Sequence, residues 1–450
     1  MTISDAVKKV LQFYKKCYGM LIDPRQVIDA VRWRTHNLDV RKTAIGMVPG
    51  VVQVGERSVS QKISTKSGSR FKKIYKNNGL SKIHYQRELL ARGLFGDQPW
   101  IAPILKKRKN WFLLPFYPPE TRLDKAAARA DAEERLEIAR QAISVLFDIF
   151  LQGYAHCDFH AENLFWVDGQ IKVVDFELMT PYPAGLRPAF PMCYDITGKG
   201  LESPERTENM CYEKRHFRNL SLVDTLRVPS CTLLQEMGIH FKKELNQVSK
   251  TFETKGKRHT CQAGRIYCSF ELPYLQVEES EAQRNTERRF KQLGVTEDVL
   301  DGKTILDLGS NMGGVLFQAQ SFGPRMSVGV EYDAEKVDVS QRIAAFNGLT
   351  SVSFMQRDID RLNADDFDRS FDVVFCLAIE KHLQKPNRLY SLLSQLCSGV
   401  VFFEGNSSTD PDEVRRRLLD SGFSQVDYLG ISDDDCVDLN NCRPLLVALK

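Results

Sequence analysis

Polar side chains spaced for phosphoryl transfer stand in the first half of the chain. Asp158 precedes Asn163 by five residues, and Asp175 follows Asn163 by twelve, at the end of an apolar strand expected at 171–174. A phosphoryl-transfer site needs an oxygen base beside two magnesium ligands, and this spacing supplies them. We expect Asp158 to take the acceptor proton and Asn163 and Asp175 to hold Mg²⁺. A polar loop before a buried strand explains each residue singly but not their joint spacing.

A lysine and a glutamate are expected to hold the phosphates of a nucleotide beside these groups. The pattern at 70–76 predicts a strand in which Lys72 and Lys73 are adjacent. Neighbouring side chains on a strand point to opposite faces, so only one of the two lysines can enter the site. Glu88, on a helix expected around 85–93, would keep that lysine aimed. Two surface lysines and a surface glutamate are the alternative.

A glycine-rich run between Thr304 and Gly314 indicates a second site. It predicts a buried strand, a turn and the start of a helix. This is the arrangement of Rossmann-like nucleotide sites, in which small residues let the ligand approach the backbone closely. The residues of this run expected to bind the ligand are Asp307, Gly309, Asn311 and Gly313.

Acidic residues after the next two expected strands narrow the choice of ligand. The strand at 326–330 ends in Glu331, which is placed to accept hydrogen bonds from both ribose hydroxyls. Asp358 follows the strand at 352–355, where it would meet the adenine amino group. His382 follows a fourth strand. It is either the base that group transfer to a neutral hydroxyl requires or a residue that caps a helix or lines the pocket.

The length of 450 residues favours two or three domains. An amphipathic helix is expected from Ser4 to Tyr18, and further helices around 220–237 and 278–291. The expected parts are, in order, a helical extension at 1–47, a strand-rich and then helical domain at 48–255, a connecting segment at 256–285 and an α/β domain at 286–450.

Composition bears on compartment and partners. The 11 cysteines show no framework spacing, which favours a reducing, cytoplasmic compartment. We expect no signal peptide and no membrane-spanning segment, because no long apolar run is present. The net charge is only +4, but Lys and Arg crowd the region 41–109. Such basicity suits nucleotide phosphates, an acidic glycan, a membrane surface or RNA.

The region 48–195 resembles the lipopolysaccharide kinase group, whose members are distant relatives of eukaryotic protein kinases. His156, Asp158 and Asn163 carry the resemblance together with the run Asp175-Phe176-Glu177. It implies a bilobal, protein-kinase-like α+β domain that uses ATP and Mg²⁺. The Lys-Ile-Tyr pattern favours Lys73 for the phosphate-binding lysine, with Lys72 as the fallback.

This region also departs from the kinase pattern. Residues 55–58 lack the repeated glycines of a phosphate-covering loop, and Glu177 stands where protein kinases have glycine. No Ala-Pro-Glu element is present, which weakens the case for a protein substrate. An inactive kinase relative remains an alternative, although such proteins commonly lose the base or a metal ligand and this chain keeps both.

The region 286–450 resembles the class I S-adenosylmethionine-dependent methyltransferases in Asp307, Glu331 and Asp358. The resemblance implies a Rossmann-like domain with S-adenosylmethionine as methyl donor. A dinucleotide dehydrogenase is the rival, but it usually shows Gly-x-Gly-x-x-Gly, whereas the glycines here stand at 309, 313 and 314. The segment 265–289 is expected either to cover the acceptor site or to be a packed entry helix.

Together these patterns predict an α/β multidomain, bifunctional kinase and methyltransferase. The same pair of activities occurs in the O-antigen chain-terminating kinase-methyltransferases, although the domain order here is reversed. That resemblance implies a bacterial surface glycan or another sugar acceptor, in the cytoplasm or peripherally at the inner membrane. Two alternatives stay open: a kinase-like half that only binds or regulates, and an acceptor that is RNA or a small natural product.

Overall fold

The computed structural model divides into two compact units. Unit 1 comprises Met1–Pro183 and Tyr194–Leu233, and unit 2 comprises Ala184–Cys193 and Leu234–Lys450. The expected helical extension at 1–47 lies outside the described residues. The structure describes residues 51–54, 58–65, 68–75, 79–183, 187–197, 225–254, 257–260 and 264–450.

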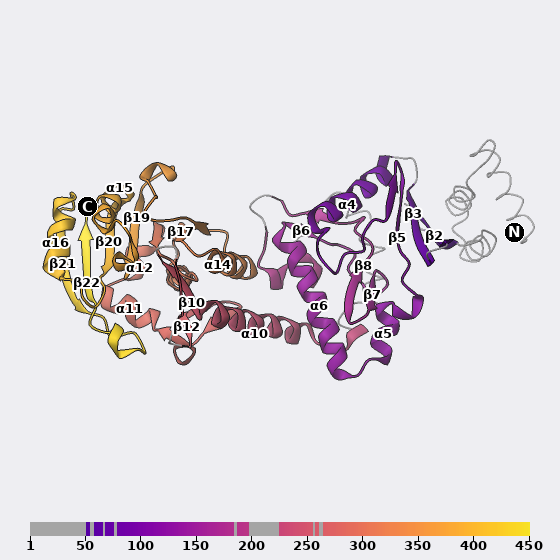
Figure 1. Ribbon diagram of the computed structural model, residues 1–450, viewed down its shortest axis with the longest axis horizontal. Helices are drawn as coiled ribbons and strands as arrows, with labels where there is room; N and C mark the ends of the chain where they lie inside the picture. The colour runs from indigo at the N-terminus through magenta and orange to yellow at the C-terminus, as the bar shows by residue number, and fades with distance from the viewer. Residues whose placement is uncertain are drawn as a thin grey trace, which may run out of the picture. The chain divides into compact units, whose positions relative to one another are not determined.

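Unit 1 opens with an antiparallel five-stranded sheet in the order β1-β2-β3-β5-β4. Helix α4 (Gly79–Phe95) packs against β3 (Figure 1). A small core of Tyr75, Tyr85, Phe112 and Leu114 joins the helix to the sheet. The strands are β1 (Val51–Val54), β2 (Ser58–Thr65), β3 (Gly68–Tyr75), β4 (Lys106–Arg108) and β5 (Trp111–Pro115).

The rest of unit 1 is mainly helical, as the sequence pattern predicts. Helix α6 begins after Asp131, whose side chain accepts a hydrogen bond from the backbone N–H of Glu134 at 2.9 Å, as expected of an N-cap. The hairpin of β7 and β8 turns through Asp168 and Gly169, which have φ of 51° and 74°, as such two-residue turns require. The elements are α5 (Leu123–Arg129), α6 (Ala132–Leu151), β6 (Tyr154–Ala155), β7 (Leu164–Val167), β8 (Gln170–Val173), β9 (Thr180–Pro181) and α7 (Tyr194–Thr197).

Unit 2 is built on a seven-stranded sheet in the order β18-β17-β16-β19-β20-β22-β21. The strands β16 to β20 are parallel to one another, and β22 is antiparallel to both of its neighbours. Strands β17 and β18 lie on one side of β16, and β19 and β20 lie on its other side, so the order of the strands reverses between β16 and β19. The strands are β16 (Thr304–Leu308), β17 (Met326–Glu331), β18 (Val352–Gln356), β19 (Phe371–Leu377), β20 (Cys397–Glu404), β21 (Gln425–Ile431) and β22 (Pro444–Leu449).

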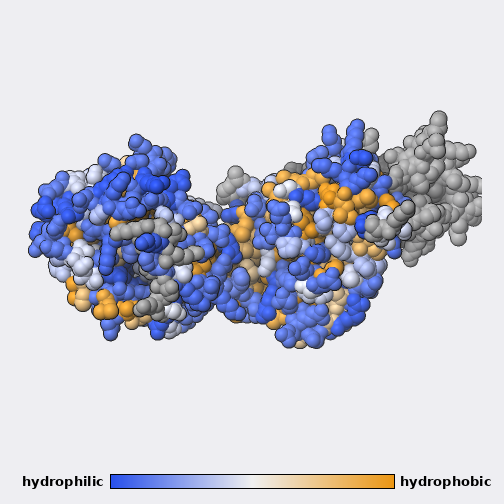
Figure 2. All heavy atoms as spheres, viewed as in Figure 1, coloured by the Kyte–Doolittle hydropathy of each residue, from blue (hydrophilic) through white to orange (hydrophobic). Residues whose placement is uncertain are grey.

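Helices cover both faces of this sheet, and the alternation of side chains along β19 shows how. Val374 and Cys376 join the core beneath α15 and α16, whereas Phe375 points to the other face and stacks on Phe290 of α11 with ring centroids 5.8 Å apart. Buried apolar residues thus gather inside, and Figure 2 shows a largely hydrophilic surface over unit 2. The helices are α11 (Thr286–Leu293), α12 (Glu297–Leu300), α13 (Gly314–Ala319), α14 (Ala334–Asn347), α15 (Pro386–Leu396) and α16 (Pro411–Asp420).

The segment before the sheet differs from the sequence-based expectation. The helix expected around 220–237 corresponds to α10 (Ser230–Ser249). The start of the expected range falls in residues 198–224, which lie outside the described part of the chain. The expected connecting segment 256–285 lies within unit 2. Strand β10 (Thr251–Thr254) precedes this segment, and the strands within it are β11 (Lys257–Thr260), β12 (Ile266–Cys268), β13 (Phe270–Leu272), β14 (Leu275–Val277) and β15 (Ala282–Arg284).

The prediction of a continuous helix over 278–291 is wrong. The structure has one 3₁₀ turn, then the strand β15, and only then α11. Strand β15 pairs in parallel with β12, and Asn285 caps α11 by accepting a hydrogen bond from the backbone N–H of Arg288. Arg284 and Arg289, two of the charged residues in this segment, are buried.

The carboxylate that compensates these two arginines belongs to Glu404, at the end of β20. Its oxygens lie 3.0 Å from Arg284 and 3.2 Å from Arg443, and Arg289 also pairs with it. Arg284 further pairs with Asp434 at 2.7 Å. Burial by itself raises the pKa of Glu404, but the three guanidinium groups outweigh burial and lower the pKa to about 2.

No described helix is apolar and long enough to cross a membrane.

Replacing Glu404 by glutamine is predicted to destabilise unit 2. Glu404→Gln removes the carboxylate that pairs with the buried Arg289, while Arg284 keeps Asp434, and breaking a buried ion pair from one side costs about 3–5 kcal/mol. Urea unfolding followed by circular dichroism measures the loss. Glu413→Gln is the matched control, because Glu413 pairs with Arg416 and Arg417 at the surface and exposed pairs contribute about 0–1 kcal/mol.

The pH dependence of the stability of unit 2 is a second test of the role of Glu404. Because the pKa of Glu404 falls from 4.5 to about 2 on folding, its stabilisation is complete above about pH 4.5 and is lost as the pH falls toward 2. Equal stability of wild type and Glu404→Gln at neutral pH would contradict the assigned role.

Candidate functional site

In unit 1 the structure brings together the residues that the sequence singled out for nucleotide chemistry. The ammonium of Lys73 lies 2.9 Å from Glu88 and 2.7 Å from Asp175. Glu177, the departure from the kinase pattern, lies 3.2 Å from the same ammonium. Lys72 instead lies over the ring of Trp111, 4.0 Å from its centroid. The geometry thus places Lys73, and not Lys72, among the carboxylates of this site.

Two residues that sequence reasoning missed hold this cluster in place. The hydroxyl of Tyr75 donates to Glu88 at 3.1 Å. Arg92 pairs with the other oxygen of Glu88 and donates to the backbone carbonyl of Val174 at 3.2 Å, directly before Asp175. The spacing of Glu88 and Arg92 by four residues on one helix is a signal that could have found this pair.

The loop that carries Asp158 is held by hydrogen bonds among its own side chains and by one carboxylate that is distant in the sequence. The amide of Asn163 donates to Asp158 at 3.0 Å, and His160 lies 3.4 Å from the same carboxylate. Asp195 accepts hydrogen bonds from the backbone N–H groups of His156 and Cys157, at 2.7 and 2.8 Å. Cys157 has φ of 72°, a strained conformation for a residue with a side chain. Asp195 therefore fixes the turn that presents Asp158.

Burial and charge set the protonation of this cluster. Burial raises the pKa of Asp175, Lys73 opposes the rise, and Glu177 adds to it, so that the pKa reaches about 7. Burial also opposes the charged form of Lys73, but the neighbouring carboxylates outweigh burial and raise its pKa well above the ordinary value. Burial lowers the pKa of His156 to about 4, so its imidazole is neutral at physiological pH.

The residues of this loop suit a divalent cation in part. Asn163 uses its amide nitrogen to hold Asp158, which leaves the amide oxygen, the atom that Mg²⁺ prefers, without a hydrogen bond in the described part of the chain. Asp175 supplies carboxylate oxygens beside Lys73. Among the described residues, no group of three or more His, Cys, Asp or Glu side chains is arranged as a metal cage.

In unit 2 the glycine-rich turn follows β16 as expected. Gly309 has φ of 77°, and a Cβ there would lie 2.4 Å from the side chain of Ile379. Gly313 also has φ of 77°, and a Cβ there would meet the ring of Phe354 at 2.6 Å. Both positions therefore exclude side chains for reasons of conformation and of space.

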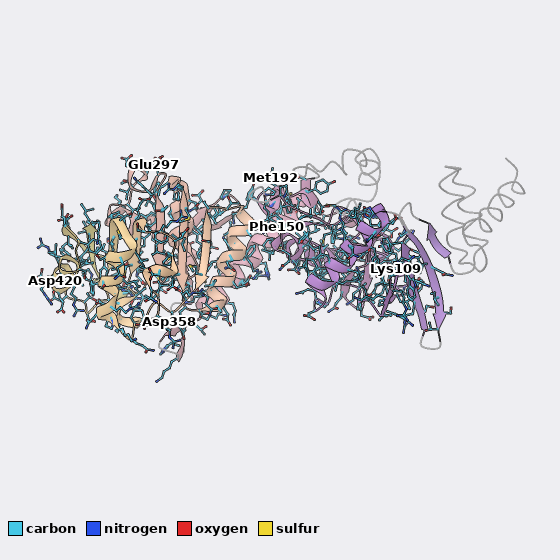
Figure 3. All side chains as sticks on the ribbon, turned by 90° about the horizontal axis from the view of Figure 1, so that it is seen from above. Lys109, Phe150, Met192, Glu297, Asp358 and Asp420 are labelled. Carbon is cyan, nitrogen blue, oxygen red and sulfur yellow. The ribbon has the colours of Figure 1, made fainter. Side chains whose placement is uncertain are left out.

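A cavity of about 370 Å³ lies beyond this turn, within unit 2. Its lining includes Ala378 and Ile379, which follow β19, so it opens where the order of the parallel strands reverses, the usual ligand site of such sheets. In Figure 3, Asp358 lies at one edge of unit 2 and Glu297 at the opposite edge. The sequence-predicted residues that line the cavity are Gly309, Asn311, Glu331, Asp358 and His382.

Two predicted ligand-binding residues lie outside this lining. Asp307 is buried within β16, and burial raises its pKa to about 7. Gly313 packs against aromatic rings instead. Sequence reasoning had not singled out the other polar residues of the lining, and Arg443 and Gln283 give no local signal because the sheet alone brings them there. The missed polar residues are Ser249, Gln283, Lys336, Asp360, Gln384, Asn440 and Arg443.

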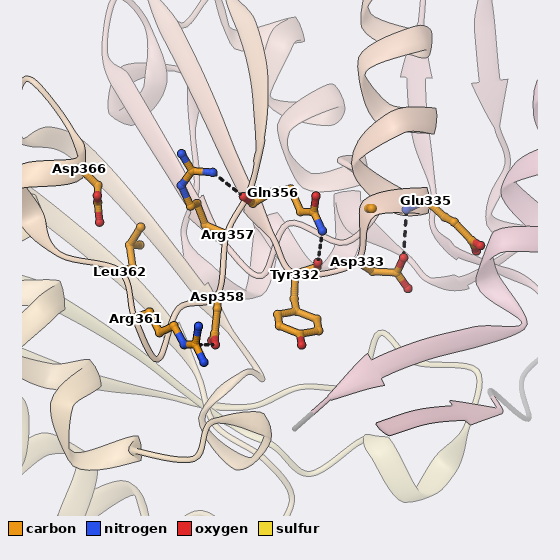
Figure 4. A pocket seen from close by; sticks show the side chains of 10 residues that line it. Tyr332, Asp333, Glu335, Gln356, Arg357, Asp358, Arg361, Leu362 and Asp366 are labelled. Atoms are coloured by element: carbon orange, nitrogen blue, oxygen red, sulfur yellow. Dashed lines mark hydrogen bonds and ion pairs between the residues drawn. The ribbon is translucent and has the colours of Figure 1, made fainter. Parts of the chain in front are cut away.

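The carboxylate of Glu331 organises the loops around the cavity. It accepts hydrogen bonds from the backbone N–H groups of Asn311, Tyr332 and Asp333, at 2.8, 2.9 and 3.0 Å. A second hollow of about 590 Å³ shares Tyr332 and Asp358 with the cavity. Figure 4 shows Asp358 beside Arg361 in this hollow, with their charged groups 3.5 Å apart.

Comparison with known families gives a match in this part of the chain. Residues 300–417 match the model of the family described as "Methyltransferase domain". The match contains the glycine turn, Glu331, Asp358 and His382. Several cavity-lining residues, including Arg265 and Arg443, lie outside it.

Two curated proteins show similarity over short segments. A tRNA U34 carboxymethyltransferase of Desulfotalea psychrophila (strain LSv54 / DSM 12343) is 28% identical over 147 residues, which is 32% of this chain and 45% of that protein. A ubiquinone biosynthesis O-methyltransferase of Pasteurella multocida (strain Pm70) is 26% identical over 113 residues, which is 23% of this chain and 46% of that protein. The chain thus spans less than half the length of the curated relatives it matches.

Solved structures show a distant likeness. The N-terminal domain of EvdMO1 with SAH bound is 16% identical with a TM-score of 0.33, and the match covers 48% of this chain and 96% of that chain. WbdD is 20% identical with a TM-score of 0.34, over 42% of this chain and 45% of that chain. Neither likeness bears on substrate. The C-terminal part of the chain therefore carries a methyltransferase domain with the α/β fold typical of class I S-adenosylmethionine-dependent methyltransferases.

Proposed function

We propose that the cavity of unit 2 binds S-adenosylmethionine and transfers its methyl group. The observation that carries this proposal is the joint lining of one cavity by Gly309, Glu331 and Asp358. Glu331 would accept hydrogen bonds from the ribose, and Asp358 from the adenine. The methyl donor would supply an activated carbon, while the residues of the chain orient it and exclude water.

The chain offers a proton acceptor at the same cavity. Methyl transfer is an in-line displacement that depends on alignment, and a neutral hydroxyl acceptor also requires a base. His382 lines the cavity and would take that proton. An acceptor that is already an oxyanion needs no base, and His382 would then only shape the pocket.

Loss of the Glu331 carboxylate is predicted to weaken binding of S-adenosylhomocysteine. Glu331→Gln replaces a charged acceptor by a neutral amide, so affinity should fall about tenfold. Isothermal titration calorimetry measures it. Glu335→Gln, in the first turn of α14 and outside the lining of this cavity, is the control. A change of less than about twofold in Glu331→Gln, with the fold intact, would exclude the proposed nucleoside orientation.

We also propose that unit 1 binds ATP and transfers its terminal phosphoryl group to a hydroxyl. The support is the convergence of Lys73 with Glu88 and Asp175, together with the bond between Asn163 and Asp158. Lys73 would hold phosphate oxygens, and Asp158 would accept the proton of the acceptor. Mg²⁺ would be held by Asn163 and Asp175 and would offset phosphate charge.

Adjacent lysines provide a sharp test of the phosphoryl-transfer proposal. Lys73→Ala should lower ATP-dependent phosphorylation about 10²-fold, because it removes a positive charge aimed at the reacting phosphates. Lys72→Ala should leave it within about twofold, since Lys72 packs on Trp111. Transfer from radiolabelled ATP measures both. Equal rates in the two variants would favour a kinase-like half that only binds or regulates.

We propose that the two activities act in sequence on one acceptor, a bacterial surface glycan or another sugar. Support comes from the two candidate sites on one chain and from the resemblance in expected domain content to O-antigen chain-terminating enzymes. The tRNA enzyme among the relatives keeps RNA as an alternative acceptor class.

The sequential proposal predicts that methylation depends on prior phosphorylation. A glycan pool given both ATP and S-adenosylmethionine should gain one phosphate plus one methyl group, and the pool given S-adenosylmethionine alone should gain neither. Mass spectrometry of the products detects each gain. Undiminished methylation without ATP would separate the two activities.

A further inference from the structure

Charge is distributed unevenly around the methyl-transfer cavity. The lining carboxylates belong to Glu331, Asp358 and Asp360, and all three lie inside the segment that matches the methyltransferase family. The lining residues outside that segment are polar or cationic, and none is acidic. They are Ser249, Arg265, Tyr267, Gln283, Asn440 and Arg443.

Lys336 is the most unusual member of the lining. Its side chain is only 4% exposed, and it makes no hydrogen bond or ion pair with any residue that the structure describes. Lys336 lines the cavity, and no carboxylate of the described residues pairs with its ammonium group. Lys336 also lies in the first turn of α14, where the helix dipole disfavours a positive charge. Neither local structure nor a described neighbour accounts for a lysine here.

Arg265 likewise pairs with no carboxylate among the residues that the structure describes. Arg265 is exposed, and its guanidinium group donates a long hydrogen bond of 3.4 Å to the backbone carbonyl of Ala282. Arg443, in contrast, pairs with Glu404 at 3.2 Å. Two uncompensated cations, Lys336 and Arg265, therefore line the same cavity.

The carboxylates of the lining bind backbone N–H groups and Arg361, and in the described part of the chain none of them pairs with Lys336 or Arg265. Glu331 accepts three backbone N–H groups. Asp360 accepts the backbone N–H groups of Gln384 and Lys385, at 2.7 and 2.8 Å. Asp358 accepts the N–H of Asp360 and lies 3.5 Å from Arg361. The positive charge of Lys336 and Arg265 is therefore available to a ligand.

We propose that Lys336 and Arg265, with the hydroxyl group of Tyr267, form an oxyanion subsite that receives a carboxylate or phosphate group of the acceptor. The proposal rests on the proposed methyl transfer at this cavity. The acceptor is favoured over the methyl donor as the source of the oxyanion because Arg265 and Tyr267 lie outside the family segment. Such additions to a common domain are suited to set the acceptor.

Inorganic phosphate is a direct probe of this subsite, measured by calorimetry in the presence of saturating S-adenosylhomocysteine. Wild type should bind phosphate, and Lys336→Met and Arg265→Gln should each weaken that binding about tenfold, the effect of losing one charge-assisted contact. Arg361→Gln is the control, because Arg361 is 87% exposed and lines the second hollow. Phosphate binding that all three variants retain would overturn the proposal.

Two further measurements separate the competing explanations. Lys336→Met should keep or raise the melting temperature, since it removes a positive charge from the first turn of α14; a large fall would show that Lys336 has a structural partner and would overturn the proposal. Both variants should bind S-adenosylhomocysteine within about twofold of wild type. If the variants bound S-adenosylhomocysteine about tenfold more weakly but bound 5′-methylthioadenosine unchanged, the subsite would belong to the carboxylate of the methyl donor. That result would also overturn the proposal. Failure of wild type to bind S-adenosylhomocysteine would instead refute the proposed function.

Discussion

The buried carboxylate of Glu404 is the charge around which unit 2 is assembled. It stands at the end of β20, and its three guanidinium partners come from β15, from α11 and from the residue before β22. A buried charge has to be compensated at close range because its hydration has been removed. Meeting this requirement ties the segment before the methyltransferase-family match to the last strand of the sheet. The wall that carries Arg265 and Arg443 is held by this compensation.

Unit 1 meets a related constraint with the opposite charge at its centre. The ammonium of Lys73 is shared by Glu88, Asp175 and Glu177, while Arg92 neutralises the second oxygen of Glu88. The extra carboxylate of Glu177 makes this cluster richer in negative charge than the pattern of one lysine with one glutamate and one aspartate. Positive charge from a bound cation would offset this excess of negative charge.

Each unit places its site where the backbone leaves ordinary conformations. Cys157 and Gly309 both have positive φ, and each precedes or begins a loop whose polar groups are aimed by a carboxylate, Asp195 in unit 1 and Glu331 in unit 2. Glycine adopts positive φ freely, whereas the strain at Cys157 persists only where surrounding contacts fix it. The carboxylates that accept backbone N–H groups therefore shape the sites without being members of the proposed catalytic groups.

The sequence by itself determined the local features. Helix α6, the turn at Gly309 and the acids at 331 and 358 follow from periodicity, glycine placement and strand ends, all of which depend on neighbouring residues. Only the tertiary structure decided that β15 is a strand, that Arg284 and Arg289 are buried, and that Lys336 and Arg265 share a cavity. These outcomes depend on compensation of charge between residues as far apart as Arg284 and Asp434. No local pattern encodes such pairs, because the cost of burying each charge is met only after the chain has folded.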